Sequence, residues 1–145
     1  MTAAGLDAKT LADIEQIKQL KARYFRFMDS KKWTDWRACF TDDMHFYRDQ
    51  DPNPIDSSGD AFVSRVSKHL ERAVTVHQGH MPEIEITGPT TAHGVWAMFD
   101  WVNKPEENRQ GYGHYIEDYE KGPDGRWRIK SLRLTRIRVD SIKGK

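Results

Sequence analysis

The chain contains only one cysteine, Cys39, in 145 residues. A lone cysteine excludes a disulfide within the chain, which fits the reducing cytosol, so we expect a cytoplasmic location. Long apolar runs are missing as well. None approaches the roughly 18 residues of a membrane span, and the segment from Met1 to Lys9 lacks the apolar core of a signal peptide. The sequence therefore argues against a membrane protein and against a secreted one.

An excess of charge of either sign is also absent, because 23 Lys and Arg residues nearly balance 22 Asp and Glu residues. The resulting net charge of +1 creates no bulk field toward nucleic acid or an anionic membrane. Basic residues do gather between Arg126 and Lys145, but such a run is more typical of the solvated face of a terminal strand than of a nucleic-acid stripe. We expect neither nucleic acid nor a membrane as a partner.

The length suits a single domain, 1–145, of which we expect residues 1–10 to be flexible. From Leu11 to Met28 apolar residues recur every three or four positions, which predicts a helix with one buried face, and Tyr24 lies on that face. A short second helix carries Trp36, Cys39 and Phe40. A strand, a loop rich in Asp, Pro and Ser, and a third helix are predicted at Met44–Arg48, Asp49–Gly59 and Asp60–Ala73.

The periodicity changes to two in the second half, which indicates consecutive antiparallel strands. The stretch Lys104–Arg109 is predicted to be a polar connection between two of them. Helices followed by strands define an α+β domain in which a curved antiparallel sheet wraps around the N-terminal helices, leaving a cone whose mouth suits a small-molecule pocket. The predicted strands are Val74–Thr87 with an interruption at Pro82, Ala92–Val102, Gly111–Glu120 and Arg126–Val139.

Two histidines, His77 and His80, are three residues apart on the first of these strands. Because neighbouring side chains of a strand alternate between its faces, the two rings point to opposite sides and cannot easily chelate one metal. Zinc also needs three or four convergent ligands at recognisable spacing, and the sequence offers no such motif. We predict no metal site and expect one histidine of the pair to face the cavity.

Asp100 lies on an otherwise apolar strand face, together with Trp96 and Met98. Burial there raises the pKa of a carboxyl group and makes it either a proton donor or a partner for a cation. The residues alone leave open that Asp100 lies at a strand end near water. Arg136 similarly follows Leu132 on one face of the last strand, and an arginine that reaches out to solvent is the simpler interpretation there.

Several segments resemble SnoaL-like proteins of the NTF2-like superfamily, over a region from Ile14 to about Val139. This resemblance implies an NTF2-like fold, a cone-shaped α+β barrel. As to function, it implies only that the chain shares a superfamily with dehydratases, ketosteroid isomerases, epoxide hydrolases, polyketide cyclases and non-catalytic binders. The matching segments are Ile14–Trp33, Phe40–Met44, His77–Ile86, Thr91–Trp96 and Gly125–Ile129.

Within that superfamily the sequence most resembles the scytalone dehydratase and bile acid 7α-dehydratase branch. Scytalone dehydratase has a tyrosine where this chain has Met28 and a histidine near Asp100, so a naphthalene-type melanin substrate is not expected. The resemblance to the bile acid enzyme implies a catalytic set made of Tyr24, Asp29, His77, Asp100 and Arg136.

The same resemblance implies roles for this set in a cofactor-independent dehydratase. His77, oriented by Asp29, removes a proton from carbon, and Tyr24 polarises the neighbouring carbonyl. Asp100, partly protonated by its apolar surroundings, protonates the departing hydroxyl, while Arg136 holds an anionic group or developing charge. The expected substrate is a small hydrophobic, ring-bearing molecule, a polycyclic or steroid-like hydroxyketone. Its apolar walls are predicted to be Trp33, Phe46, Trp96 and Met98.

Two other functions fit the same residues. A ketosteroid-isomerase-like isomerase or a polyketide cyclase would use the acid and base without loss of water, and a non-catalytic domain would only bind a small molecule. We also expect a homo-oligomer, a dimer or trimer, assembled through the outer sheet face. That face carries Val95, Ala97, Phe99 and Trp101.

Overall fold

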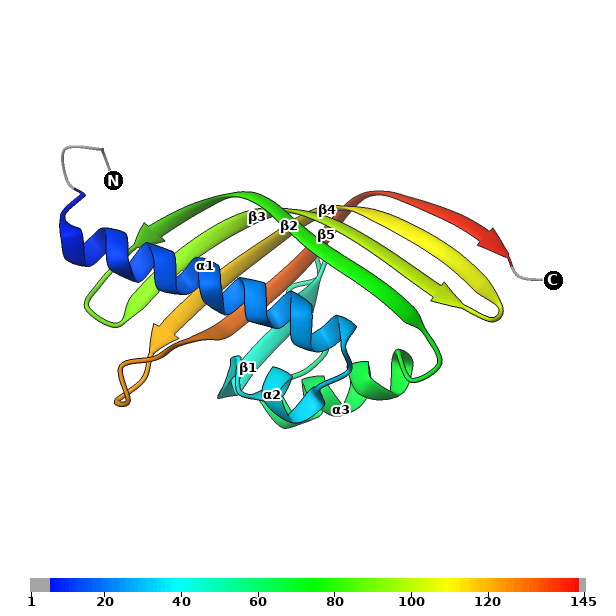
Figure 1. Ribbon diagram of the computed structural model, residues 1–145, viewed down its shortest axis with the longest axis horizontal. Coiled ribbons are helices and arrows are strands. Elements are labelled where there is room, and N and C mark those ends of the chain that lie inside the picture. Colours follow the sequence, from blue (N-terminus) through cyan, green and yellow to red (C-terminus); the bar gives the residue numbers. More distant parts are fainter. Residues whose placement is uncertain (1–5, 144–145) are drawn as a thin grey trace.

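A long helix, α1 (Ala8–Asp29), lies across the concave face of a curved sheet in the computed structural model, which describes residues 6–143 (Figure 1). The side chain of Asp7 caps the helix by accepting a hydrogen bond from the Thr10 backbone N–H at 2.7 Å. The helix thus begins three residues before the predicted start at Leu11. Residues 8–10, which were expected to be flexible, therefore belong to the helix, and residues 1–5 lie outside the described part of the chain.

Two shorter helices pack below one end of α1, as Figure 1 shows. Helix α2 (Trp33–Arg37) is shorter than predicted, because Phe40 already starts a strand that pairs with the last strand of the sheet. Helix α3 (Gly59–His69) is capped by Ser58 and ends four residues before the predicted Ala73. None of the helices within residues 6–143 is both long and apolar enough to cross a membrane.

The five strands form one curved, open sheet in the order β1-β5-β4-β3-β2. Four consecutive strands are antiparallel as predicted, but β1 runs parallel to β5, which the sequence pattern did not indicate. The α+β, NTF2-like fold is confirmed, with the helices on the concave side of the sheet. The strands are β1 (Phe40–Arg48), β2 (Val74–Ile86), β3 (Thr91–Lys104), β4 (Glu107–Lys121) and β5 (Trp127–Lys143).

The predicted polar connection Lys104–Arg109 is wrong. Strands β3 and β4 remain paired up to Lys104 and Glu107, so only a tight two-residue turn joins them. Polar side chains suit strands here because this hairpin projects beyond the helices (Figure 1) and has no apolar layer to cover it. As a result Arg109 belongs to β4, on the same face as the buried Gly111.

Strand β2 contains a bulge between His80 and Glu83, where Met81 has a positive φ of 42°. The extra residue inverts the alternation, so that odd-numbered residues face the helices before the bulge and even-numbered residues after it. His77 is turned inward and His80 is exposed. The prediction that the two histidines point to opposite faces is therefore confirmed.

A buried polar chain ties α1 to the sheet. Lys21 Nζ lies 2.6 Å from Glu117 Oε2, and both side chains are fully buried. The hydroxyl of Tyr119 donates to Glu117 at 2.7 Å and accepts from the Trp96 indole N–H at 2.9 Å. Burial lowers the pKa of Lys21 while Glu117 opposes that effect. Because an uncompensated charge here is costly, this series of buried polar contacts fixes the position of α1 over β4.

A second buried ion pair crosses the sheet above a glycine. Asp100 on β3 faces Gly111 on β4, and Arg136 on β5 reaches over Gly111 to bond both oxygens of Asp100, at 3.1 and 2.8 Å. A Cβ atom at position 111 would overlap the Arg136 guanidinium and the Asp100 carboxylate. Only glycine in the middle strand leaves room for this pair.

We therefore expect Gly111→Ala to lower the free energy of unfolding by about 2–4 kcal/mol, because a methyl group there forces the buried pair apart. Chemical denaturation followed by circular dichroism measures the change. The matched control is Gly88→Ala in a surface turn, where the new methyl meets only the Thr91 hydroxyl; it should cost less than about 1 kcal/mol. Equal losses in the two variants would contradict the proposed role of Gly111.

Candidate active site

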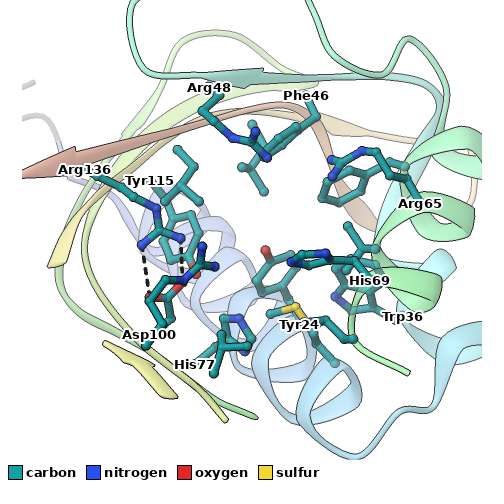
Figure 2. Close-up of a pocket in the computed structure, with 18 residues that line it drawn as sticks. Tyr24, Trp36, Phe46, Arg48, Arg65, His69, His77, Asp100, Tyr115 and Arg136 are labelled. Atoms are coloured by element: carbon teal, nitrogen blue, oxygen red, sulfur yellow. Dashed lines mark hydrogen bonds and ion pairs between the residues drawn. The ribbon is translucent and has the colours of Figure 1, made fainter. Parts of the chain in front are cut away.

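A pocket of about 100 Å³ opens between the end of α1, helix α3 and the inner face of the sheet (Figure 2). Polar residues form its inner end: Tyr24, His77, Asp100, Tyr115 and Arg136. Apolar walls come from both helices and strands: Trp36, Phe46, Phe62, Leu132 and Leu134. Basic residues lie at the remaining side: Arg48, Arg65, His69 and Arg109.

His77 is held by the carboxylate of Asp29, the last residue of α1. The His77 ring Nδ1 lies 2.7 Å from Asp29 Oδ1, and the His77 backbone N–H donates to Oδ2 at 2.9 Å. Thr75 donates a further hydrogen bond to Oδ1 at 2.8 Å. Because a carboxylate only accepts, Nδ1 must carry the proton, and the lone pair is left on Nε2. The His77 side chain is only 9% exposed and lines the pocket.

Two tyrosines present their phenols to the same inner end. Burial, followed by the neighbouring Tyr115 and Glu117, raises the pKa of Tyr24 well above its ordinary value. Burial, followed by Asp100 and Glu117, does the same to the pKa of Tyr115. Both groups therefore stay protonated at neutral pH, and the two phenols also interact with each other. Lys21 Nζ lies behind them, 3.6 and 3.8 Å from the two ring centres.

Asp100 is ionised, which corrects the expectation of a partly protonated carboxyl. Burial alone raises the pKa of Asp100, but the hydrogen bonds and charge of Arg136 outweigh it and hold that pKa below the ordinary value. The inference from an apolar strand face could not include a partner two strands away. The resemblance implied that Arg136 holds an anionic group; in the structure its guanidinium bonds both oxygens of Asp100, which neutralises its charge.

The structure brings together four of the five residues that the resemblance indicated: Tyr24, His77, Asp100 and Arg136 line the pocket, with Asp29 directly behind His77. Their catalytic roles remain predictions. Of the four predicted wall residues only Phe46 lines the pocket. Trp96 and Met98 are buried in the core, the former engaged with Tyr119, and Trp33 packs on Trp36 outside the pocket.

Sequence reasoning missed Tyr115 and the basic side of the pocket. Tyr115 alternates with Gly111 and Gly113 on β4, so strand parity could have placed it inside. Arg109 was hidden by the loop prediction, and Arg48 comes from a strand whose parallel pairing was not foreseen. Among residues 6–143, no three His, Cys, Asp or Glu side chains are grouped so that they could hold a metal ion.

The ionisation of Asp100 gives a pH prediction. Because folding lowers its pKa, the stabilisation is complete above the ordinary carboxyl pKa of about 3.9 and is lost as the pH falls through the lower folded value. We expect Asp100→Asn to be destabilised most near neutral pH and to approach the wild type below about pH 4. Denaturation at a series of pH values measures this.

The Arg136→Gln variant provides the control, since burial then acts on Asp100 without its partner. NMR titration should find the pKa of Asp100 above its ordinary value in that variant and below it in the wild type. A difference between wild type and Asp100→Asn that grows as the pH falls would contradict an ionised Asp100.

Solved structures with the same fold come from several bacteria. A candidate scytalone dehydratase from Novosphingobium aromaticivorans superposes with a TM-score of 0.81 at 18% identity, over 90% of this chain and 87% of that one. Rv3472 from Mycobacterium tuberculosis, a protein of unknown function, superposes with a TM-score of 0.77 at 24% identity, over 94% of this chain and 79% of that one. A type 2 hexachlorocyclohexane dehydrochlorinase, LinA, superposes with a TM-score of 0.79 at 16% identity, over 93% of this chain and 92% of that one.

At these identities the structural likeness shows the fold alone. The sequence match is more extensive, because the SnoaL-like domain is recognised over residues 9–133, from the first helix into the last strand. Since that region covers most of the chain, the chain belongs to the SnoaL-like domain family.

Proposed function

We propose that this protein is a cofactor-independent lyase that removes a proton from carbon and expels hydroxide as water from a small, ring-bearing hydroxyketone. The observation that carries the proposal is the imidazole of His77, whose Nδ1 is fixed by Asp29 while the ring, only 9% exposed, lines a pocket. An imidazole with a free Nε2 is a suitable base near neutral pH. Scytalone dehydratase and dehydrochlorinase chemistry among proteins of this fold supports a small-molecule enzyme.

The proton that His77 removes must come from a carbon made acidic by a neighbouring carbonyl. Tyr24 and Tyr115 are placed to donate hydrogen bonds to that carbonyl oxygen, and their raised pKa values keep them protonated as negative charge develops there. Lys21 lies behind both rings and is paired with Glu117, so it holds the two rings in place without adding net charge. Proton abstraction and enolate stabilisation are thus assigned to different elements of the fold.

The departing hydroxide needs a proton, and an ionised Asp100 does not supply one. We assign that step to His77 itself. Nε2 takes the proton from carbon, the carbon–carbon double bond forms as the carbon–oxygen bond breaks, and the imidazolium returns the proton to the leaving oxygen. Asp29 stabilises the imidazolium between the two transfers. The products are an unsaturated ketone and water, formed on one face of the ring.

The size of the pocket favours a smaller substrate than the steroid-like one first expected. Its volume of about 100 Å³ is below the ~300–1,000 Å³ of typical drug-sized sites. A volume of this size suits one ring, for which Phe46, Leu132 and Leu134 supply apolar contacts, and a larger ring system would have to extend out of the pocket. We therefore propose a monocyclic substrate or one ring of a larger molecule.

A second activity, loss of hydrogen halide, is favoured by the same ionised Asp100. Chloride leaves without a proton, so His77 alone would suffice as the base, and a dehydrochlorinase shares the fold. An isomerase, in contrast, would return the proton to carbon and expel no leaving group. Product mass separates the three activities, because dehydration removes water, the second activity removes hydrogen halide, and isomerisation leaves the mass unchanged.

We expect His77→Gln to lower kcat for 3-hydroxycyclohexanone by about 10²–10⁴-fold, because the base is lost while the fold is kept. Formation of the conjugated ketone is followed by ultraviolet absorbance and its mass. His80→Gln, at the exposed histidine beyond the pocket, is the matched control and should keep wild-type activity. Equal activity of the His77 variant and the wild type would exclude His77 as the base.

Asp29→Asn tests the orientation of the ring. The amide N–H can donate to Nδ1 and so move the proton to Nε2, which removes the base without moving the ring; kcat should fall by about 10²–10⁴-fold. The melting temperature and the NMR tautomer signature of His77 are measured alongside. A variant that has the Nε2–H tautomer and full activity would contradict the proposed mechanism.

A further inference from the structure

The basic side of the pocket carries more positive charge than the described residues neutralise. Four arginines line the pocket and only one carboxylate does. Asp100 is used by Arg136, and Asp56, behind the wall, is used by Arg65 through bonds of 2.9 and 2.7 Å. Arg48 and Arg109 therefore have no carboxylate partner among the described residues.

Neither Arg48 nor Arg109 forms an ion pair or a side-chain hydrogen bond within residues 6–143. Arg109 is the stronger observation, because its Nε–H is buried and has no acceptor there. Buried donors are nearly always satisfied, so an unsatisfied one on a residue that lines a pocket points to an acceptor that the described residues do not supply. A solvated arginine would not bury this atom.

The lowered pKa of Arg48 shows that the arginines lining the pocket repel one another. Burial, followed by the charges of Arg65, Arg136 and Arg109, lowers the pKa of Arg48, although Asp49 next to it acts in the opposite direction. Asp49 is itself engaged, since its Oδ1 accepts the Arg136 backbone N–H at 3.1 Å. An arginine stays charged even so. The basic side is therefore held together against like-charge repulsion that an anion would relieve.

We propose that the substrate carries an acidic group, a carboxylate or a phosphate ester, which Arg48 and Arg109 bind while the ring is presented to His77. The second part rests on the proposed function; the anion site itself does not. In Figure 2 Arg48 lies across the pocket from His77, and both residues line it. An acidic group bound at Arg48 is therefore on the opposite side of the pocket from the imidazole.

His69 offers a readout that is independent of turnover. It lines the same side of the pocket, and burial, followed by the charges of Lys104, Arg109, Arg65 and Arg48, lowers its pKa. Lys104 also lies 3.3 Å from the ring Nδ1. An anion bound at Arg48 and Arg109 opposes these charges and raises the pKa of His69, whereas a neutral ligand of the same shape does not.

The test compares benzoate, phenyl phosphate and benzamide by calorimetry on the full chain. At least one acid should bind about tenfold or more tightly than benzamide, with an affinity that falls as salt rises. The two acids distinguish the sources, because benzoate reports a carboxylate site and phenyl phosphate a phosphate-ester site. NMR titration should show the pKa of His69 rising with the bound acid and not with benzamide.

Two variants localise the site. Arg109→Gln and Arg48→Gln should each reduce the preference for the acid over benzamide by about tenfold. Arg48 ends an edge strand, so its variant tests the site even if Arg109→Gln does not fold. The matched control is Arg138→Gln on β5, whose side chain is 72% exposed and paired with Asp140 outside the pocket; it should bind the acids as the wild type does.

Equal binding of benzoate, phenyl phosphate and benzamide to the wild type would overturn the inference, as would a preference for acids that survives both substitutions. His77→Gln separates this inference from the proposed activity. Loss of elimination with acid binding retained leaves the anion site standing. Elimination from neutral ketones without any preference for acids would remove the anion site and leave the lyase.

Discussion

The contact between Asp29 and strand β2 determines where the site can be. A carboxylate at the C-terminal end of a helix is opposed by the helix dipole, so it needs compensation. Thr75 and His77 supply it through three hydrogen bonds, one from the backbone. These bonds fix the end of α1 against an edge strand of the sheet and set the proton position on the imidazole at the same time. Fold and candidate chemistry thus share one interaction.

The other two buried ion pairs also both join elements of the fold and lie in or next to the wall of the pocket. Lys21 with Glu117 joins helix to sheet, and Asp100 with Arg136 joins β3 to β5 over Gly111. A buried pair adds little net stability compared with apolar packing, but breaking it is costly. Such pairs therefore act as constraints on geometry more than as sources of stability. Here Lys21 lies over the rings of both tyrosines, and Asp100 and Arg136 line the pocket beside them.

Local patterns in the sequence predicted the features that depend on local geometry. Helical periodicity predicted that Tyr24 faces inward, and strand alternation predicted that His77 and His80 face opposite sides, and both are found in the structure. The failures are long-range. The protonation of Asp100 depends on Arg136, a residue 36 positions away that arrives over a glycine in the intervening strand. Arg109 was missed because a projecting hairpin allows polar residues to form strands, which a hydropathy pattern interprets as a loop.

The two ends of the pocket belong to opposite edges of the sheet. His77 lies on edge strand β2, whereas Arg48 lies on edge strand β1, against which α3 packs. Changes in β1, α3 or the loop between them can alter the basic side without moving the Asp29–His77 pair, since no contact joins the two edges directly in the strand order. Arg109 is the exception, because it lies on the middle strand β4. A scaffold arranged in this way can keep one proton-transfer centre and vary the group it recognises through β1 and α3.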